Sequence, residues 1–417
     1  MSRAGAVRAA NALGVRWAEQ ADPAGGTVLV PAGVWPLLGL LAPAGSPEVR
    51  GELAQALGLP PAAAADRARD LLGLLRDVPA VRSALGLWTA PWLRPHPEWL
   101  SGLPADVHGR LTGDAEEDRR QLDAWAEAAT DGQIDAMPVE VDPDTRLVLA
   151  AALTVRTDWI RPFGEVHGVP YGMDDDGWGR PVRYLSRWTS MLDRVAVLDT
   201  PAGLVTEVRV LGYGDISVHL LLGEPDARPG QVLAAGIEVL NQRHRRTTAD
   251  RLPDGSPGPG LTIARIARYQ PEDLLAVNVP QFTVEADHDL LARAALFGLT
   301  TLGTRSETEH RLPGLADGEP LYLNSARQRA TATFGPIGFR AASVTALGGG
   351  AGGAEVTRRP PYLQRIARVG FGRPFGFLAV HRTSGLVLAA GWVTDPDPEP
   401  EADSVEKWLD EEWSDED

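Results

Sequence analysis

The chain has 417 residues, of which 40 are basic and 56 acidic, giving a formal net charge of −16. Residues 395–417 hold twelve acids and one base, Lys407, which leaves 44 acids against 39 bases in the rest of the chain. This nearly neutral body argues against nucleic acid as a partner, because phosphate binding needs a clustered basic surface. The absence of cysteine excludes disulfides, thiolate metal sites and thiol nucleophiles.

The first twenty residues predict an amphipathic helix. Their apolar side chains recur at helical spacing, at Val7, Ala10, Leu13 and Trp17, and charges interrupt the segment too often for a secretory signal. The longest uncharged stretch, residues 23–47, contains three prolines and favours a short strand followed by a core helix over a membrane span. We therefore expect a soluble, cytoplasmic chain with no membrane partner.

Helices are predicted through residue 75, apart from a strand at 27–30, and again at 118–129, before a Thr-Asp-Gly end signal. The apolar run 145–155 fits a strand covered on both faces or a buried helix. Period-two patterns predict strands within residues 180–225. A helix is expected over 231–252, where the basic run 243–246 suits a solvated helix end better than a polyanion site.

The C-terminal half predicts a strand at 275–285, a helix at 289–297, and alternation after residue 325 that gives way to a loop at 335–361. Two further strands are expected at 375–382 and 386–393. Helices and strands follow one another in irregular order, with no internal repeat. We therefore expect one α+β domain over residues 1–396 and an acidic, disordered tail over 397–417, whose alternating prolines favour an extended, solvated spacer.

One long segment resembles the serpin family. The matching residues are Trp125, 130–134 (TDGQI), 142–149 (DPDTRLVL) and 159–163 (WIRPF). Further segments keep the family order, namely 28–31 (VLVP), 277–282 (VNVPQF) with 298–300 (GLT), 373–377 (RPFGF), and 385–396 around Gly391, Trp392 and Val393. The resemblance implies a single α+β serpin fold of about nine helices and three β-sheets, with an exposed reactive loop between Phe334 and Pro374.

The resemblance also implies a mechanism. In the family, a target protease attacks the loop and becomes acyl-linked to it, and the cut loop then inserts as a strand into the central sheet and distorts the protease. The expected partner is a serine protease, and the chain itself would be a monomer without catalytic residues, metal or cofactor. Extracellular family members make export the alternative to a cytoplasmic location.

Insertion sets a demand on the loop, because every second residue of the new strand must fit inside the core. The small residues Ala341, Ser343 and Thr345 suit inward positions, whereas Phe339 is expected to fit poorly and Pro336 removes an N–H near the strand end. Aligning the family's hinge glycine with Gly338 assigns the hinge to Gly338, Phe339, Arg340, Ala341, Ala342, Ser343, Val344 and Thr345.

Two regions of the central sheet control insertion in the family. At the breach, the upper end where the loop first inserts, Trp159 matches the family's tryptophan. At the shutter, lower down, the family's polar residues are replaced by Gly33, Ala151 and Gln328. We therefore expect an apolar shutter without the family's hydrogen-bonded latch.

The arginine pair at 358–359, the candidate cleavage site, has two interpretations. Arg358 and Arg359 follow a flexible glycine-rich run and would suit a trypsin-like protease with an acidic pocket, or they form a solvated turn before two prolines. Two functions stay open as well: a suicide inhibitor of a serine protease, or a non-inhibitory serpin-fold binding or scaffold protein whose loop is cut as an ordinary substrate. Residues 341–345 favour inhibition, and Phe339, Pro336, Gly33 and Ala151 favour the alternative.

No other segment suggests chemistry. His219 is expected to be a packed or surface histidine, and the acidic run 174–176 lacks the alternating spacing of a calcium loop. No nucleophile can be paired with a base from the sequence, so we expect no enzyme activity.

Overall fold

The computed structural model describes residues 3–20, 25–137, 139, 141–142, 144–170, 173, 178–306, 308–318, 320–339 and 361–399. Within these ranges the chain forms eight α-helices and three β-sheets. This mixed architecture agrees with the α+β fold expected from the sequence.

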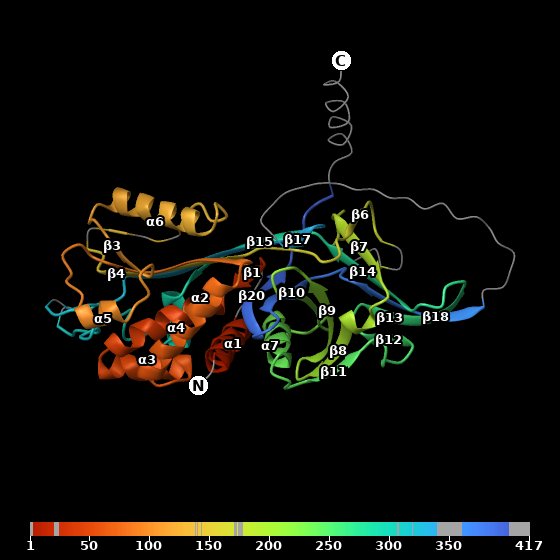
Figure 1. Ribbon diagram of the computed structural model, residues 1–417, viewed down its shortest axis with the longest axis horizontal. Coiled ribbons are helices and arrows are strands. Elements are labelled where there is room, and N and C mark those ends of the chain that lie inside the picture. The colour runs from red at the N-terminus through yellow and green to blue at the C-terminus, as the bar shows by residue number, and fades with distance from the viewer. Residues whose placement is uncertain are drawn as a thin grey trace, which may run out of the picture.

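Helices cover both faces of the central sheet (Figure 1). On one face lie α1 (Ala4–Glu19), α2 (Pro31–Leu41), α3 (Pro47–Leu57) and α4 (Pro61–Asp77), and on the other lies α6 (Ala115–Ala129). Helices α2, α3 and α4 each begin with proline, whose fixed φ suits a first helical position. Every residue of α2 is buried, because it lies between the sheet and the other helices. None of the helices described has the length and apolar character needed to cross a membrane.

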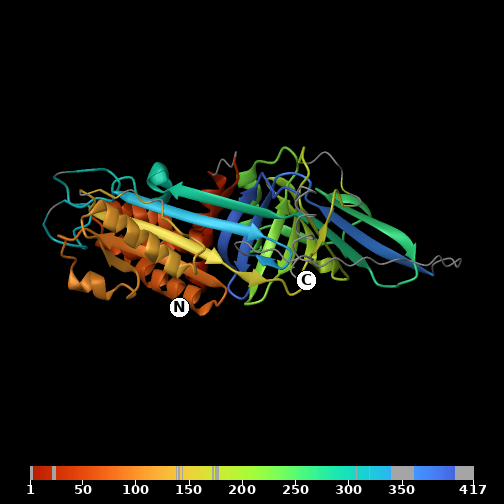
Figure 2. The same ribbon diagram turned by 90° about the horizontal axis from the view of Figure 1, so that it is seen from above.

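The central sheet has the strand order β3-β2-β4-β16-β17-β5, with β15 paired to β16. Strands β4 and β16 run parallel. Their ladder begins with Val148 opposite Ser325 and ends with Ala152 opposite Arg329. Figure 2 shows the long strands of this sheet side by side. The bounds are β3 (His108–Arg110), β2 (Val81–Thr89), β4 (Leu147–Val155), β16 (Ser325–Phe334), β17 (Gly338–Phe339), β5 (Thr157–Asp158) and β15 (Phe282–Asp289).

The apolar run at 145–155 is a strand, β4, rather than a buried helix. All nine of its residues are buried. Leu149, Ala151 and Leu153 belong to the main core, and Val148 and Ala150 belong to a second cluster with α6. Burial on both faces explains why β4 lacks the alternation of a half-exposed strand.

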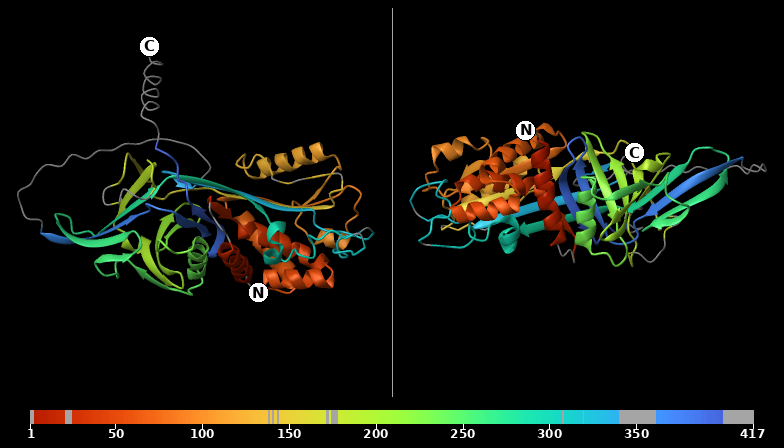
Figure 3. Two further views of the ribbon diagram at one scale, coloured as in Figure 1. Left: turned by 180° about the vertical axis from the view of Figure 1, so that it is seen from behind. Right: turned by 90° about the horizontal axis from the view of Figure 1, so that it is seen from below.

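Two further sheets form the other end of the elongated molecule, opposite α2–α4 (Figure 3). The β10 sheet has the order β1 (Thr27–Leu29), β20 (Leu386–Val393), β19 (Phe375–His381), β10 (Ile216–Leu222), β9 (Gly203–Leu211), β8 (Val195–Thr200) and β11 (Arg245–Thr248). The β14 sheet has the order β12 (Gly255–Gly258), β13 (Leu261–Arg268), β18 (Tyr362–Gly370), β14 (Leu274–Pro280), β7 (Tyr184–Thr189) and β6 (Gly164–Val166).

The helix predicted over 231–252 is wrong in its second half. Helix α7 spans Pro229–Val239, Gln242 adopts a left-handed φ of 58°, and the chain then forms β11. The helix predicted at 289–297 is also too long, because β15 extends to Asp289 and α8 covers only Ala294–Phe297. Arginines interrupt the apolar pattern of β13 and β18, which the sequence did not predict as strands.

The start of the acidic segment is not the solvated spacer expected from its prolines. Through residue 399 the chain stays attached to the body: the Asp397 carboxylate accepts hydrogen bonds from the Thr283 N–H and from Gln281 Nε2, both at 3.0 Å. Pro398 forms a bridge with Val182. The predicted disordered tail beyond residue 399 lies outside the described residues and stays a prediction.

Candidate functional site

The hinge begins as a tight hairpin in which β16 turns back into β17. The Gly335 N–H donates to the Gly338 carbonyl at 3.0 Å, and Phe339 lies opposite Phe334 in the ladder. Pro336 occupies the first position of the two-residue turn, where its fixed φ is favourable. Its missing N–H therefore removes no ladder hydrogen bond.

The segment that follows β5 holds this hairpin by donating hydrogen bonds to three consecutive carbonyl groups, those of residues 335–337. The Trp159 N–H donates to the Ile337 carbonyl at 2.7 Å, and Trp159 Nε1 donates to the Gly335 carbonyl at 2.9 Å. The Phe163 N–H donates to the Pro336 carbonyl at 2.9 Å. Trp159 therefore uses both its backbone and its ring to fix the turn.

The two residues of β17 already lie inside the central sheet. Gly338 pairs with Asp158 and Phe339 with Thr157, so β17 separates β5 from the end of β16. The Phe339 side chain is 2% exposed and packs against the Phe377 ring at 5.9 Å. The expectation that Phe339 fits poorly is therefore wrong, because the core at this end of the sheet is aromatic.

Six aromatic side chains connect the hinge to the body. The Phe334 ring stacks on Phe282 with centroids 5.5 Å apart, and it lies 4.8 Å from the Trp159 ring and 5.5 Å from Phe163. Phe282 in turn lies 5.3 Å from Phe377. We call this set the breach cluster; it comprises Trp159, Phe163, Phe282, Phe334, Phe339 and Phe377.

Gly338 is required by the close approach of β5. A Cβ atom at this position would lie 2.3 Å from the Thr157 carbonyl oxygen and 3.1 Å from Asp158 Cα. Because both obstacles are backbone atoms, no side-chain movement relieves the clash. Only glycine permits β17 to pair with β5 at this register.

The sequence suggested an apolar shutter, but the structure places a buried polar side chain there. Gln328 lies opposite Ala151 in the ladder between β4 and β16, and a Cβ atom on Gly33 would lie 3.9 Å from Ala151 Cβ. The Gln328 side chain is fully buried, and neither its Nε2 nor its Oε1 has a hydrogen-bond partner among the described residues. Such a buried, unpaired amide costs about 1–3 kcal/mol.

The rest of the predicted hinge and the candidate cleavage site lie outside the described residues, as does the acidic run 174–176. These predictions cover Arg340, Ala341, Ala342, Ser343, Val344, Thr345, Arg358 and Arg359.

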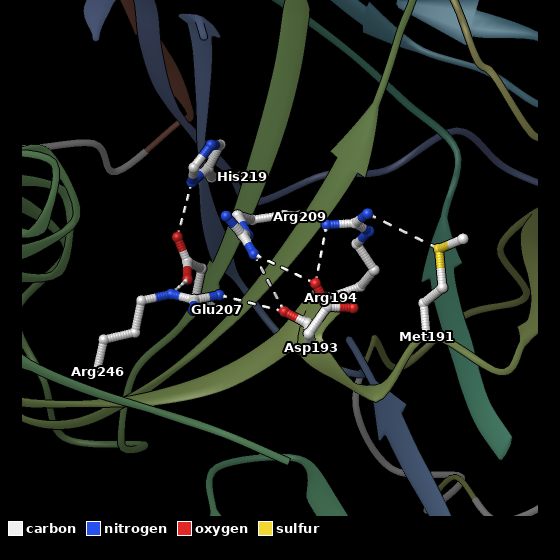
Figure 4. Close-up of polar contacts among 7 residues, drawn as sticks. All are labelled: Met191, Asp193, Arg194, Glu207, Arg209, His219 and Arg246. Atoms are coloured by element: carbon white, nitrogen blue, oxygen red, sulfur yellow. Dashed lines mark hydrogen bonds and ion pairs between the residues drawn. The ribbon is translucent and has the colours of Figure 1, made fainter. Parts of the chain in front are cut away.

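A second polar cluster, which the sequence did not reveal, lies in the β10 sheet (Figure 4). Ser217 Oγ lies 3.0 Å from His219 Nε2, and His219 Nδ1 lies 2.7 Å from Glu207 Oε1. This is the connectivity of a hydrolase triad. The three side chains are nevertheless buried, with Ser217 only 2% exposed, so a substrate has no access to the hydroxyl. The cluster is structural, and His219 is a packed histidine.

Arg246 completes this cluster, because its Nε donates to Glu207 Oε2 at 2.6 Å. Burial alone would raise the pKa of Glu207, but the hydrogen bond and charge of His219, together with those of Arg246, lower it to about 2. Arg243 and His244 both pair with Glu238, at 3.1 and 2.9 Å. Three of the four bases in the run 243–246 therefore have carboxylate partners, and the run lies outside α7.

Comparison with known proteins agrees with the fold. The family described as "Serpin (serine protease inhibitor)" matches residues 10–169. The chain is 25% identical over 376 residues to putative serpin-Z6C of Oryza sativa subsp. japonica, covering 84% of this chain and 81% of that protein. It is 24% identical over 285 residues to human plasminogen activator inhibitor 2, covering 68% of this chain and 61% of that protein.

Solved structures show the same fold. Thyroxine-binding globulin in complex with thyroxine superposes with a TM-score of 0.68 at 15% identity, over 94% of this chain and 99% of that one. Native protease nexin-1 with heparin superposes with a TM-score of 0.67 at 15% identity, over 95% of this chain and 100% of that one. The fold is the serpin fold. In sequence, the chain resembles the serpin family, whose model matches residues 10–169.

The substitution Gly338→Ala should release β17 from β5. The added Cβ meets the Thr157 backbone, so we expect the free energy of unfolding to fall by about 1–3 kcal/mol, as for other overpacked sites. Denaturant unfolding measures the change. Gly335→Ala is the matched control, because its Cβ would lie 3.8 Å from the nearest atom, the Gly338 carbonyl oxygen. Equal stability of the two variants would contradict the assignment.

Glu207→Gln should destabilise the fold in a pH-dependent way. The folded pKa of about 2 lies below the ordinary value of 4.5, so the carboxylate stabilises the fold fully above about pH 4.5 and less as the pH falls toward 2. We expect a loss of about 2–4 kcal/mol at pH 7 that shrinks below pH 4.5, measured by denaturant unfolding across pH. Glu238→Gln is the control and should cost less, because Glu238 is a more exposed carboxylate that pairs with Arg243 and His244. A loss of stability in Glu207→Gln that does not change with pH would refute the account.

Proposed function

We propose that the protein is a serpin-type serine protease inhibitor that acts by loop cleavage, acyl trapping and insertion of the loop into the central sheet. The observation that carries this proposal is the position of Gly338 and Phe339, which lie as a short strand between β5 and β16. The first step of strand addition is therefore present in the uncleaved chain. Further insertion only lengthens a strand that has already formed.

The seam below β17 supports this lengthening. The ladder between β4 and β16 ends at Ala152 opposite Arg329, and β17 provides the next pairing along the seam. Because β4 and β16 run parallel, one antiparallel strand between them can pair with both. Each inserted residue then adds hydrogen bonds on two sides, which offsets the few lost when β4 and β16 separate.

The register of β17 also fits the composition of the loop. Continued from Phe339 opposite Phe334, it would set Ala341 opposite Ala332 and Ser343 opposite Ala330. Both positions on β16 hold alanines that face the core. The inward residues of the hinge are small, so they can be accommodated without displacing large side chains.

The same register would set Thr345 opposite Gln328 on one side and Ala151 on the other. Thr345 is an inward position and carries a hydroxyl, which can donate to and accept from the unpaired Gln328 amide. The closed sheet leaves this amide unsatisfied and the inserted sheet would satisfy it. Gln328 thus favours insertion by about 1–3 kcal/mol.

The alternative is a non-inhibitory serpin-fold binding or scaffold protein whose loop is cut as an ordinary substrate. The observation that favours it is the fixed position of Phe339, whose ring is 2% exposed and held against Phe377. A hinge anchored in this way could be the end of insertion rather than its beginning. The two functions differ in the fate of the loop and of the protease after cleavage.

The target we propose is a trypsin-like serine protease that cleaves near Arg358 or Arg359, with the chemistry supplied by that protease. The protein would have no catalytic activity and need no cofactor. The monomeric state and the cytoplasmic or extracellular location stay predictions.

Incubation with a panel of serine proteases tests the proposal. We expect a complex that survives SDS with at least one trypsin-like protease, and a higher melting temperature for the cleaved chain. Ser343→Arg should convert the protein into a substrate, because the charged side chain faces the core on insertion. Ala342→Arg is the matched control, since its side chain would face outward. Cleavage with full protease turnover and no rise in melting temperature would support the alternative instead.

The pairing of Thr345 with Gln328 has its own test. Thr345→Val should leave the unfolding of the uncleaved chain unchanged and lower the free energy of unfolding of the cleaved form by about 1–3 kcal/mol. Gln328→Met should stabilise the uncleaved chain, because it removes a buried unpaired amide at similar volume. Guanidinium unfolding of both forms measures these effects. Identical cleaved-state stability of wild type and Thr345→Val would rule out the pairing.

A further inference from the structure

Four arginines from separate parts of the chain meet beside the breach cluster. Arg161 follows β5, Arg187 lies in β7, Arg194 precedes β8 and Arg209 lies in β9. They line a pocket of about 80 Å³ together with Ile160, Thr189, Met191 and Leu211. With about 30 Å³ per water molecule in the liquid, this pocket holds two or three waters or one small polyatomic ion.

Positive charge at this pocket exceeds negative charge. Asp193 Oδ2 lies 3.1 Å from Arg194 Nη1 and 3.9 Å from Arg209 Nη2, as Figure 4 shows. Arg161 and Arg187 have no carboxylate within ion-pair distance in the part of the chain that the structure describes. The buried acid Glu207, whose charge also acts on Arg209, is already bound by His219 and Arg246. Of the four guanidinium groups, two therefore share the Asp193 carboxylate and two have no carboxylate partner among the described residues.

Two of these guanidinium groups also carry unused donors. Arg187 Nε and Arg209 Nε are buried and have no hydrogen-bond partner among the described residues. Burial, together with the charges of Arg161 and Arg194, lowers the pKa of Arg187 to about 10. A cation in this state gains both a hydrogen bond and a counter-charge when an anion binds nearby.

We propose that this pocket binds a tetrahedral oxyanion, a phosphate or sulfate group, through Arg161, Arg187, Arg194 and Arg209. Guanidinium forks match the geometry of such oxygens, and the Thr189 hydroxyl, which now accepts from Arg161 Nη1 at 3.2 Å, offers a further donor.

The pocket is connected to the hinge by direct contacts. The Arg187 guanidinium lies 4.3 Å from the centre of the Phe163 ring, and its Nη1 donates to the Arg161 carbonyl at 2.9 Å. Phe163 in turn donates to the Pro336 carbonyl and packs on Phe334. An oxyanion that fixes Arg161 and Arg187 therefore also fixes residues 159–163, which hold the turn of the hinge. The bound state stabilises the closed breach.

Thermal unfolding in inorganic phosphate, at constant ionic strength with chloride as the replaced anion, tests the site. We expect a saturable rise in melting temperature for the full chain. Arg187→Gln and Arg209→Gln should each weaken the apparent affinity about tenfold or more. Arg245→Gln is the matched control, because Arg245 is an exposed arginine of β11 outside the pocket. An equal response in all four proteins, or no response beyond that to chloride, would overturn the proposal.

Two further measurements keep the test independent of variant folding and of protease inhibition. Glycerol 2-phosphate separates the two sources of the group: binding of both ligands assigns a phosphate group, and binding of inorganic phosphate alone assigns a free ion. Hydrogen exchange of wild type should slow at residues 335–339 when phosphate is bound. Exchange that is unchanged at these residues in saturating phosphate would overturn the link to the breach, whatever the protein does to proteases.

Discussion

The burial of Phe339 between β5 and β16 is the contact on which the rest of the site depends. Burying such a side chain contributes roughly 1.5–3 kcal/mol, and the ring lies in a cluster of five other aromatic side chains that fix its position. Gly338 is required because the ring can be buried only if the backbone passes close to Thr157. Trp159 and Phe163 hold the carbonyls of residues 335–337, and this fixed turn keeps the Phe339 ring in its buried position.

Under the proposed inhibitory function, the central sheet would be balanced between two arrangements. Its upper seam is already occupied by β17, and its middle seam is closed by a short ladder that contains the unpaired amide of Gln328. An unsatisfied amide in the closed state weakens that state without disturbing the surrounding alanines. A hydrogen-bonded latch would have the opposite effect and stabilise the closed sheet. Under the proposed inhibitory function, this unpaired amide would favour opening of the sheet at the shutter, and the contacts at the breach would keep the loop aligned for insertion.

The sequence predicted the fold well, because the serpin resemblance depends on local motifs that survive far apart in the chain, such as WIRPF at 159–163. It predicted that Phe339 lies at an inward position but misjudged the fit, because periodicity gives the direction of a side chain and not the volume opposite it. Phe282, Phe334 and Phe377 supply that volume from three strands. Ser217, Glu207 and Arg246 were missed for a similar reason, since three strands of one sheet bring them together.

The arginine pocket would make the stability of the breach depend on a bound anion. Binding and conformation are linked reciprocally, so an anion that binds the closed breach more tightly must be released, or bind more weakly, when residues 159–163 shift during insertion. A buried guanidinium such as Arg187, which lacks a carboxylate partner, is costly in the closed state unless an anion is present. The closed state would then be more stable in a phosphate-rich medium than in chloride. Under the proposed function, loop insertion would then be governed from two places, by Gln328 at the shutter and by the occupancy of the arginine pocket beside the breach.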